Sequence, residues 1–299
     1  MRRIIKKIIQ VFLKVITYVA PKENMSSHLY RIRLYILDEF HKMIMQRVRM
    51  EAYKGHTLKF IVPNVLSDWR AQTFATKEPE TLEWIDSMLE ESVLWDVGAN
   101  VGLYSLYAAK SLGVKVFAFE PSVFNLELLA RNAYENKLQD KICIVPIALS
   151  DKTNFNSMHI TTTDWGGALS TFGEAFGWDG KKINHNFQFK TIGITMDDAV
   201  AHLNLPLPNF IKMDVDGLEH LILLGGQKVL SQVESVLIEV NDNFIEQADG
   251  VNKILTNAGL KLVDKKRSLE EFSQDENIQA QDASQTREWA AFNQIWKRT

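Results

Sequence analysis

The sequence predicts an α/β fold in which a parallel sheet is covered by helices on both faces. Of the 299 residues, 46% are hydrophobic and 24% are charged, a composition typical of a globular protein. Five short segments are almost continuously apolar and alternate with stretches of helical character, which is typical of parallel strands buried on both sides. The predicted strands lie at 93–97, 115–119, 142–147, 210–214 and 235–240, and the predicted helices between them at about 102–112, 122–136, 195–203 and 217–230.

Further elements are expected on either side of this alternating region. Residues 28–50 repeat apolar residues at helical spacing, and residues 57–62 read as a strand that Pro63 ends. A helix begins at Glu78-Pro79-Glu80, with proline in its first turn and acids near its positive end. Residues 265–290 are polar and predict a long loop or insertion, and residues 291–296 could return as a last strand.

Charge divides the chain into a basic part, residues 1–50, and an acidic part, residues 51–299. The first part carries 11 Lys and Arg against three acids, a net charge of +8, so the remainder of a chain with net charge −3 carries −11. Residues 1–20 form a two-faced pattern at helical spacing, with nine apolar residues on one side and Arg and Lys on the other. This pattern predicts an interfacial helix on an anionic membrane, and packing on the domain or on a second chain is the alternative.

The cysteine content and the short uncharged runs near the N-terminus limit the compartment and the class of protein. A single cysteine, Cys143, excludes a disulfide scaffold and a cysteine-based zinc site, and favours a reducing, cytoplasmic compartment. The uncharged runs between Lys7, Lys14 and Lys22 are too short for a membrane span or a secretory signal. We therefore expect a cytoplasmic protein, with attachment to the inner face of the membrane through residues 1–20 as an open question. The overall charge gives no sign of nucleic-acid binding, and the oligomeric state is not indicated.

A glycine-containing turn follows the first strand of the alternating region. It reads Asp96-x-Gly98-x-Asn100-x-Gly102, and it differs from the dinucleotide fingerprint because the third glycine of that fingerprint is absent. Glu120 ends the next strand, 22 residues after Gly98. An acid at this position can accept hydrogen bonds from both hydroxyls of a ribose. The ordered set of strand, turn, helix, strand and acid therefore predicts a nucleoside site.

These motifs resemble those of the FkbM family of class I S-adenosylmethionine-dependent methyltransferases. The turn and the following FAFEP match the cofactor site of the class, and IKMDVDGLEHLILLGG at 211–226 and TMDD at 195–198 match the FkbM family. TKEPETLEWI at 76–85 and ALSD at 148–151 also fit, so the resemblance covers about residues 55–245. It implies a Rossmann-like, seven-stranded, mostly parallel sheet whose last strand is reversed, with the N-terminal helices preceding it. It also implies methyl transfer from S-adenosyl-L-methionine to a hydroxyl of a sugar, glycan, lipid-linked or polyketide-like metabolite.

The resemblance also implies a set of cofactor-binding residues. Asp96, Gly98, Asn100 and Gly102 are expected on the methionine side and Glu120 at the ribose. Around the adenine ring, Ser122 and Asn125 would lie beneath it, Ala148 would flank it, and Asp151 is the nearest candidate for its amino group.

The acceptor side is expected where the fourth predicted strand ends. A hydroxyl acceptor needs a base beside the transferred methyl group, and catalytic groups gather at the carboxyl ends of strands in this class of sheet. We expect Asp214 to be that base, with Lys212 and Asp216 as further catalytic residues. Expected substrate contacts are Glu219, His220, Glu239 and, as a stacking face for a sugar, Trp165. Structural roles are the alternatives for Glu219 at a helix start, His220 at the surface and Trp165 in a packed hairpin.

Three other interpretations stay open. Asp214 with Glu239, Asn241 and Asp242 offers oxygen ligands for Mg²⁺, although the spacing does not match metal-dependent catechol-type enzymes and we expect no metal. A Rossmann-type oxidoreductase using an NAD-like cofactor is disfavoured by the incomplete glycine fingerprint. A non-catalytic S-adenosylmethionine-binding scaffold is disfavoured by the intact carboxylate cluster.

Overall fold

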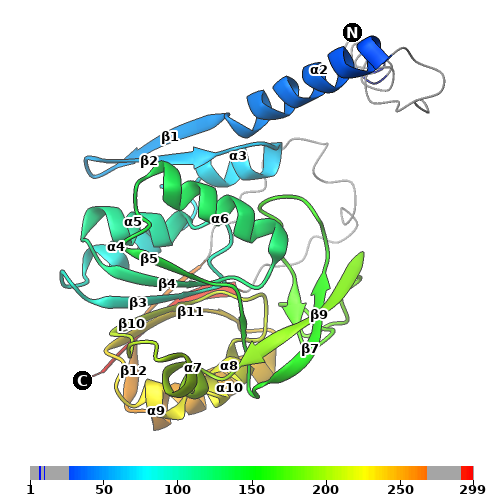
Figure 1. The fold of residues 1–299 in the computed structure, drawn as a ribbon. Helices are drawn as coiled ribbons and strands as arrows, with labels where there is room; N and C mark the ends of the chain where they lie inside the picture. Colours follow the sequence, from blue (N-terminus) through cyan, green and yellow to red (C-terminus); the bar gives the residue numbers. More distant parts are fainter. Residues whose placement is uncertain (1–6, 8–9, 11–26, 268–290, 299) are drawn as a thin grey trace.

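A seven-stranded sheet forms the centre of the protein (Figure 1). The computed structural model describes residues 7, 10, 27–267 and 291–298, so the amphipathic segment 1–20 and residues 268–290 lie outside the described residues. The strand order is β12-β13-β11-β10-β3-β4-β5, and β13 runs antiparallel to both of its neighbours. The reversed last strand that the resemblance implied is therefore confirmed. The strands are β3 (Val93–Val97), β4 (Lys115–Phe119), β5 (Ile142–Val145), β10 (Phe210–Met213), β11 (Ser235–Asn241), β12 (Leu260–Arg267) and β13 (Ala291–Arg298).

Helices cover both faces of this sheet (Figure 1). On one face lie α4 (Pro79–Asp86), α5 (Leu103–Ser111) and α6 (Val123–Glu135), and on the other lie α7 (Met196–Leu203), α8 (Glu219–Leu224), α9 (Gln227–Leu230) and α10 (Ile245–Asn257). Successive strand residues point to opposite faces. Leu94 and Val116 therefore join the core beneath α4–α6, whereas Trp95 and Phe117 join the core against α7–α10.

Two expected elements have different boundaries in the structure. The helix expected over 217–230 is interrupted at Gly225-Gly226, where a β-carbon on Gly226 would lie 2.0 Å from the Met196 Cε atom. The helix expected over 28–50 is α2 (Ser27–Met45), and it ends before β1 (Val48–Tyr53). β1 pairs with β2 (His56–Ile61) through a two-residue turn, in which Lys54 and Gly55 both have positive φ as a tight hairpin requires. This hairpin spans the boundary between residues 1–50 and 51–299.

A second sheet lies beside the first, and its strands come between β5 and α7 in the sequence. It consists of β6 (Ala148–Leu149), β7 (Asn154–Ile160), β8 (Thr171–Phe172) and β9 (Phe187–Ile194) in the order β6-β9-β7-β8. The loop from β7 to β8 contains residues 164–170, which we call the strap. β12 is a further difference from expectation, because residues 265–267, expected in a polar loop, pair with β13.

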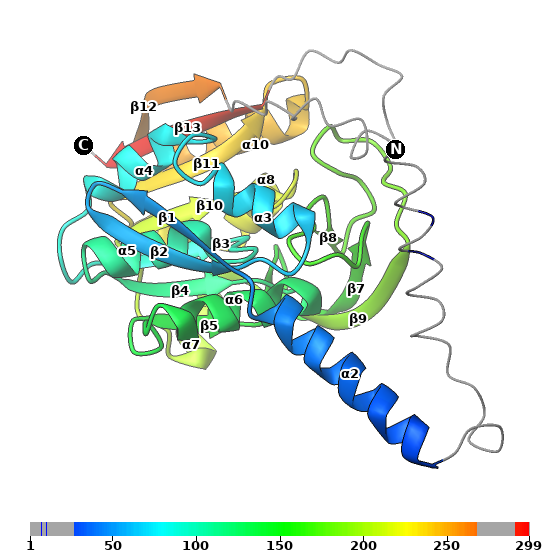
Figure 2. The ribbon, with the colours of Figure 1, turned by 90° about the horizontal axis from the view of Figure 1, so that it is seen from above.

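The N-terminal helix α2 projects beyond the other described helices and strands (Figure 2). Its last residue, Met45, packs with Ile61, Val101 and Leu128, and α3 (Val65–Gln72) follows the hairpin on the same side of the sheet. Among the described residues, no helix is long and apolar enough to cross a membrane.

Candidate functional site

The turn after β3 packs directly against the end of β10. Gly98 has φ of +84°, and a β-carbon there would lie 1.9 Å from the carbonyl oxygen of Asp214. Gly102 has φ of +87°, and a β-carbon there would lie 2.5 Å from the Leu129 Cδ1 atom. Both positions therefore require glycine for two reasons, a left-handed backbone and a lack of space. Asn100, with φ of +50°, adopts the left-handed region that asparagine tolerates.

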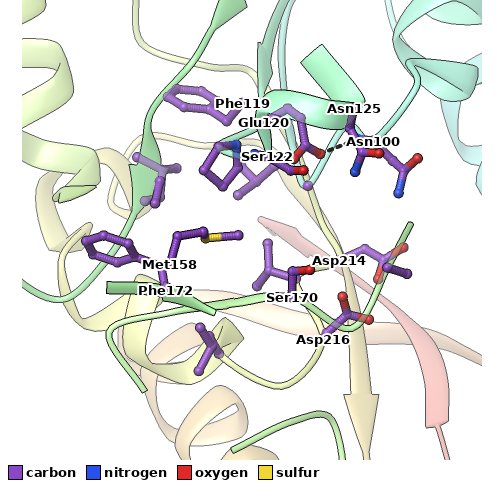
Figure 3. A pocket seen from close by; sticks show the side chains of 18 of the residues that line it. Asn100, Phe119, Glu120, Ser122, Asn125, Met158, Ser170, Phe172, Asp214 and Asp216 are labelled. Atoms are coloured by element: carbon purple, nitrogen blue, oxygen red, sulfur yellow. Dashed lines mark hydrogen bonds between the residues drawn. The ribbon is translucent and has the colours of Figure 1, made fainter. Parts of the chain in front are cut away.

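Two open cavities meet at this turn. The first cavity, of about 610 Å³, lies between the carboxyl end of β4 and the second sheet (Figure 3). The second cavity, of about 500 Å³, lies between the turn and α3. Gly98, Asn100 and Asp214 line both cavities. The first cavity is also lined by Glu120, Ser122, Asn125, Ala148, Met158, Gly167, Ser170, Phe172 and Asp216, and the second by Trp69, Arg70, Thr73, Phe74, Lys77, Glu78, Asp96, Tyr104 and Lys212.

Glu120 faces the first cavity from the end of β4 (Figure 3). Its two carboxylate oxygens accept hydrogen bonds from the backbone amides of Asn100 and Ser122, each at 2.8 Å. Burial raises the pKa of Glu120 to about 7, although these bonds oppose the rise. A carboxylate oxygen can accept more than one hydrogen bond, so Glu120 keeps acceptor capacity for a ligand.

Asp96 presents an unused acceptor beside the second cavity. Its Oδ2 atom accepts a hydrogen bond from the Ser105 hydroxyl at 2.5 Å, whereas its buried Oδ1 atom has no partner among the described residues. The Oδ1 atom of Asn100 is likewise buried without a partner in this part of the chain. Buried polar atoms are rarely left without a partner. Two such acceptors at the turn therefore fit a ligand that donates hydrogen bonds there.

Hydrogen bonds connect the strap to three segments around the site. The Asn125 side chain donates to the carbonyl oxygen of Gly167 and accepts from the amide of Gly166, both at 3.0 Å, and the Asn100 side chain donates to the same Gly167 oxygen at 2.9 Å. Further along, the amide of Leu169 donates to the Asp216 carboxylate at 2.7 Å. Asn125 therefore lines the first cavity while its amide group holds the strap.

Lys212 and Asp214 form an ion pair at the end of β10. The Lys212 ammonium lies 3.3 Å from the Asp214 carboxylate and 5.1 Å from the centre of the Tyr104 ring, and Lys212 is only 2% exposed. Burial alone would raise the pKa of Asp214, but the charges of Lys212 and Lys77 outweigh it and hold that pKa below its ordinary value. Asp214 is therefore ionised at neutral pH.

Two more carboxylates follow Asp214 on the same loop. Burial, reinforced by the charges of Asp214 and Glu219, raises the pKa of Asp216 to about 7. Glu219 accepts hydrogen bonds from the amides of Val215 at 2.9 Å and Gly217 at 3.4 Å and from the side chain of Gln247. Glu219 is fully buried and lines neither cavity. It stabilises the loop that carries Asp216.

Five other expected site residues also lie outside the linings of the two cavities: Gly102, whose missing side chain makes room for Leu129, and Asp151, Trp165, His220 and Glu239. The Trp165 indole donates to Glu127 at 3.2 Å, and Asp151 pairs with Lys152 at 3.2 Å. The buried His220 ring packs edge-on against a phenylalanine ring 5.6 Å away. Glu239 has a pKa well above its ordinary value, because burial and the charge of Asp214 both disfavour its ionisation.

Two of the side chains considered as oxygen ligands for Mg²⁺ have other contacts. Asp242 pairs with Lys265 at 2.7 Å, and the side-chain oxygen of Asn241 accepts a hydrogen bond from the backbone amide of Asn243 at 2.9 Å. In the described ranges, no group of three or more His, Cys, Asp or Glu side chains is arranged to hold a metal ion.

The outer wall of the second cavity was not predicted. It consists of Trp69 and Arg70 on α3 and of Thr73, Lys77 and Glu78 just after it. The only sequence signal was the match at 76–85, which contains Lys77 and Glu78. An eight-residue helix far from the glycine turn in sequence gives no indication that it closes over that turn.

The sheet order, the reversed last strand and the glycine turn at the end of β3 define a class I methyltransferase fold. Residues 96–262 match the family described as the methyltransferase FkbM domain, and the chain belongs to this family. It is therefore an S-adenosylmethionine-dependent methyltransferase, as the sequence motifs predicted.

Two curated relatives and one solved structure illustrate the similarity. The hexuronic acid methyltransferase AglP of Haloferax volcanii is 26% identical over 206 residues, which cover 69% of this chain and 79% of that protein. The 31-O-demethyl-FK506 methyltransferase FkbM of Streptomyces tacrolimicus is 24% identical over 170 residues, which cover 50% of this chain and 65% of that protein. The crystal structure of M. jannaschii TYW2 in complex with AdoMet is 12% identical, covers 84% of this chain and 87% of its own, and has a TM-score of 0.43.

Proposed function

We propose that this enzyme transfers the methyl group of S-adenosylmethionine to a hydroxyl group of a sugar or glycan. The observation that carries the proposal is the meeting of two cavities at Gly98 and Asp214, one beside the ribose-type acid Glu120 and one beside the ion pair of Asp214 with the buried Lys212. A sugar acceptor is supported by the hexuronic acid named for one relative. Trp69 lines the second cavity and would offer an aromatic face for a sugar ring.

The first cavity would hold the adenosine part of the cofactor, and the methionine end would pass the turn into the part of the second cavity that Asp96 lines. The unpartnered Oδ1 atom of Asp96 suits the methionine ammonium group, and Gly98 lets a ligand approach the backbone. Glu120 would accept hydrogen bonds from the ribose hydroxyls. Ser122 and Ala148 line the same cavity and would border the adenine ring. When bound, the cofactor supplies an electrophilic methyl group on a sulfonium centre whose leaving group is a neutral thioether.

Asp214 would remove the proton from the acceptor hydroxyl. It lines both cavities, so it lies where the two ligands would meet. Lys212 keeps Asp214 ionised and fixes its carboxylate at 3.3 Å. The main task left to the protein is alignment of the hydroxyl with the carbon–sulfur bond. Asp216, whose pKa is near 7, could receive the proton from Asp214.

A radiolabel experiment tests the proposal. The enzyme is incubated with methyl-labelled S-adenosylmethionine and two acceptors, a glucuronic acid glycoside and the matching glucoside, and then with a cell extract separated into lipid, glycan and protein. We expect label in a base-stable methyl ether on a sugar. Label confined to protein would contradict the proposal. Absence of transfer despite cofactor binding would favour a non-catalytic scaffold, and binding of NAD in place of S-adenosylhomocysteine would favour an oxidoreductase.

We also propose that the N-terminal part contacts an anionic membrane on its cytoplasmic face. Residues 1–20 are amphipathic and basic in sequence, and α2, which follows them closely in the chain, projects from the body (Figure 2). Several large apolar side chains of α2 are about half exposed or more, namely Ile32, Leu34, Tyr35, Ile36, Phe40 and Met43. An apolar face beside basic residues is typical of interfacial helices.

A further inference from the structure

The methionine end of S-adenosylmethionine carries two opposite charges, and the proposed site accounts for only one of them. The ammonium group has a partner in Asp96, whose Oδ1 atom is buried and unpartnered within the described ranges. The carboxylate is attached to the same carbon atom as the ammonium, so its partner must lie in the same cavity. An ionised carboxylate in a buried site needs a cation or several donors.

Three cations line the second cavity, and two of them have anionic partners. Lys212 lies 3.3 Å from the Asp214 carboxylate, and Lys77 lies 3.3 Å from the Glu78 carboxylate. Arg70 differs from both lysines because its Nε atom donates to a neutral group, the carbonyl oxygen of Gly166, at 2.5 Å. Its two terminal nitrogens make no hydrogen bond or ion pair with any described residue.

We infer that Arg70 binds the carboxylate of the cofactor's methionine end in the second cavity, which Asp96 also lines. A guanidinium group matches a carboxylate with two parallel hydrogen bonds, which an ammonium group cannot do. The charge of Arg70 also favours the ionised forms of Glu120, at the end of β4, and of Asp214 and Asp216, on the loop after β10, although burial still raises the pKa values of Glu120 and Asp216. Arg70 lies outside residues 96–262, so the family match does not include it.

The same side chain connects the cofactor to the strap. Its Nε atom holds Gly166, which leaves the terminal nitrogens for the ligand, and Gly166 and Gly167 are also held by Asn125. Binding of a carboxylate would order the guanidinium and thereby the strap over the first cavity. Arg70 would therefore act as a second binding determinant for the cofactor, contributed by α3.

The test compares two nucleosides that differ only in the amino-acid end. Calorimetric titration with S-adenosylhomocysteine and with 5′-methylthioadenosine, which lacks the ammonium and the carboxylate, is carried out on wild type, Arg70→Met and Arg70→Lys. Arg131→Met is the control, because Arg131 is an exposed arginine that pairs with Glu127. A third ligand, the decarboxylated form of S-adenosylhomocysteine, removes the carboxylate alone.

We expect Arg70→Met to weaken the binding of S-adenosylhomocysteine at least tenfold and to leave the affinities for methylthioadenosine and the decarboxylated ligand unchanged. Arg70→Lys should lose less affinity for S-adenosylhomocysteine. An equal loss for all three ligands would show that Arg70 acts only by holding the strap, and no loss would show that it does not contact the cofactor. Either result overturns the inference about Arg70. The inference rests on the proposed function, but neither result contradicts that function. Failure of the wild type to bind any of these nucleosides would overturn both.

Discussion

Gly98 lies so close to Asp214 that a β-carbon on the glycine would stand 1.9 Å from the carbonyl oxygen of the aspartate. This contact joins the cofactor turn after β3 to the end of the neighbouring strand β10, which carries the proposed base. The spatial relation between the two halves of the site is therefore fixed by backbone packing.

Replacement of Gly98 with alanine is expected to destabilise the protein and to abolish cofactor binding. Gly55 is a matched control, because it also has φ of +84° but a β-carbon there would meet no atom within 4 Å beyond its chain neighbours. Gly55→Ala should cost about 1 kcal/mol for the left-handed backbone alone, and Gly98→Ala roughly 2 kcal/mol more for the steric overlap. Urea unfolding of both variants measures the difference, and equal losses would show that the close contact is not maintained in solution.

Asp214→Asn is expected to retain cofactor binding and to lower turnover by about 10²- to 10⁴-fold, because a neutral amide cannot accept the hydroxyl proton. Steady-state rates with the labelled cofactor and titration with S-adenosylhomocysteine measure the two effects separately. Full activity of this variant would exclude Asp214 as the base.

The same assay in EDTA addresses the magnesium alternative. Wild-type activity should survive chelation. Loss of activity with EDTA, together with rescue of Asp214→Asn by added Mg²⁺, would assign Asp214 to a metal instead.

Cofactor binding is expected to release a proton near neutral pH. The pKa of Glu120 is about 7 without ligand, and ribose hydroxyls donate to its ionised form, so binding should lower that pKa. Affinity for S-adenosylhomocysteine should therefore fall as the pH decreases below about 7. Calorimetry in two buffers of different ionisation enthalpy measures the released proton, and Glu120→Gln should show no such release. Identical release in that variant would assign the proton to another group, such as Asp216.

Deletion of residues 1–20 is expected to release the enzyme from anionic vesicles without affecting cofactor binding. Each basic residue near such a surface contributes about 1 kcal/mol, and the attraction should weaken with added salt because the Debye length is about 8 Å at physiological ionic strength. Flotation with anionic and with neutral vesicles makes the comparison. Equal vesicle binding by both forms would show that the segment is not the anchor, and a truncated form unable to bind cofactor would show that it packs on protein.

The sequence predicted the central sheet and the turn well because both depend on local pattern. Mostly apolar runs such as VLWDV that alternate with helical stretches are typical of buried strands, and Gly98 and Gly102 occupy positions where a side chain does not fit. Predictions were weaker where a long-range partner decides the outcome. LKLVDKKR at 260–267 is polar, yet it forms the edge strand β12 because β13 pairs with it.

In the candidate site too, residues placed by local pattern were predicted well and residues placed by long-range packing were not. Glu120, Asp214 and Asp216 line the first cavity because their positions follow from strand ends. Glu219 and His220, a few residues further, are buried away from both cavities because the start of α8 turns them towards α10 and the segment before it. No local signal marked Arg70, since only the folded chain brings α3 to the second cavity.

Titration of S-adenosylhomocysteine into the wild type and into Glu120→Ala tests the central claim most directly. Glu120 would supply two hydrogen bonds to the ribose from an ionised group, and hydrogen bonds to charged groups contribute about 1.5–3 kcal/mol each. The account predicts tight binding by the wild type, at least about tenfold weaker binding by a Glu120→Ala protein that remains folded, and no binding of NAD by either. Unchanged affinity in the variant, or preferential binding of NAD by the wild type, would contradict it.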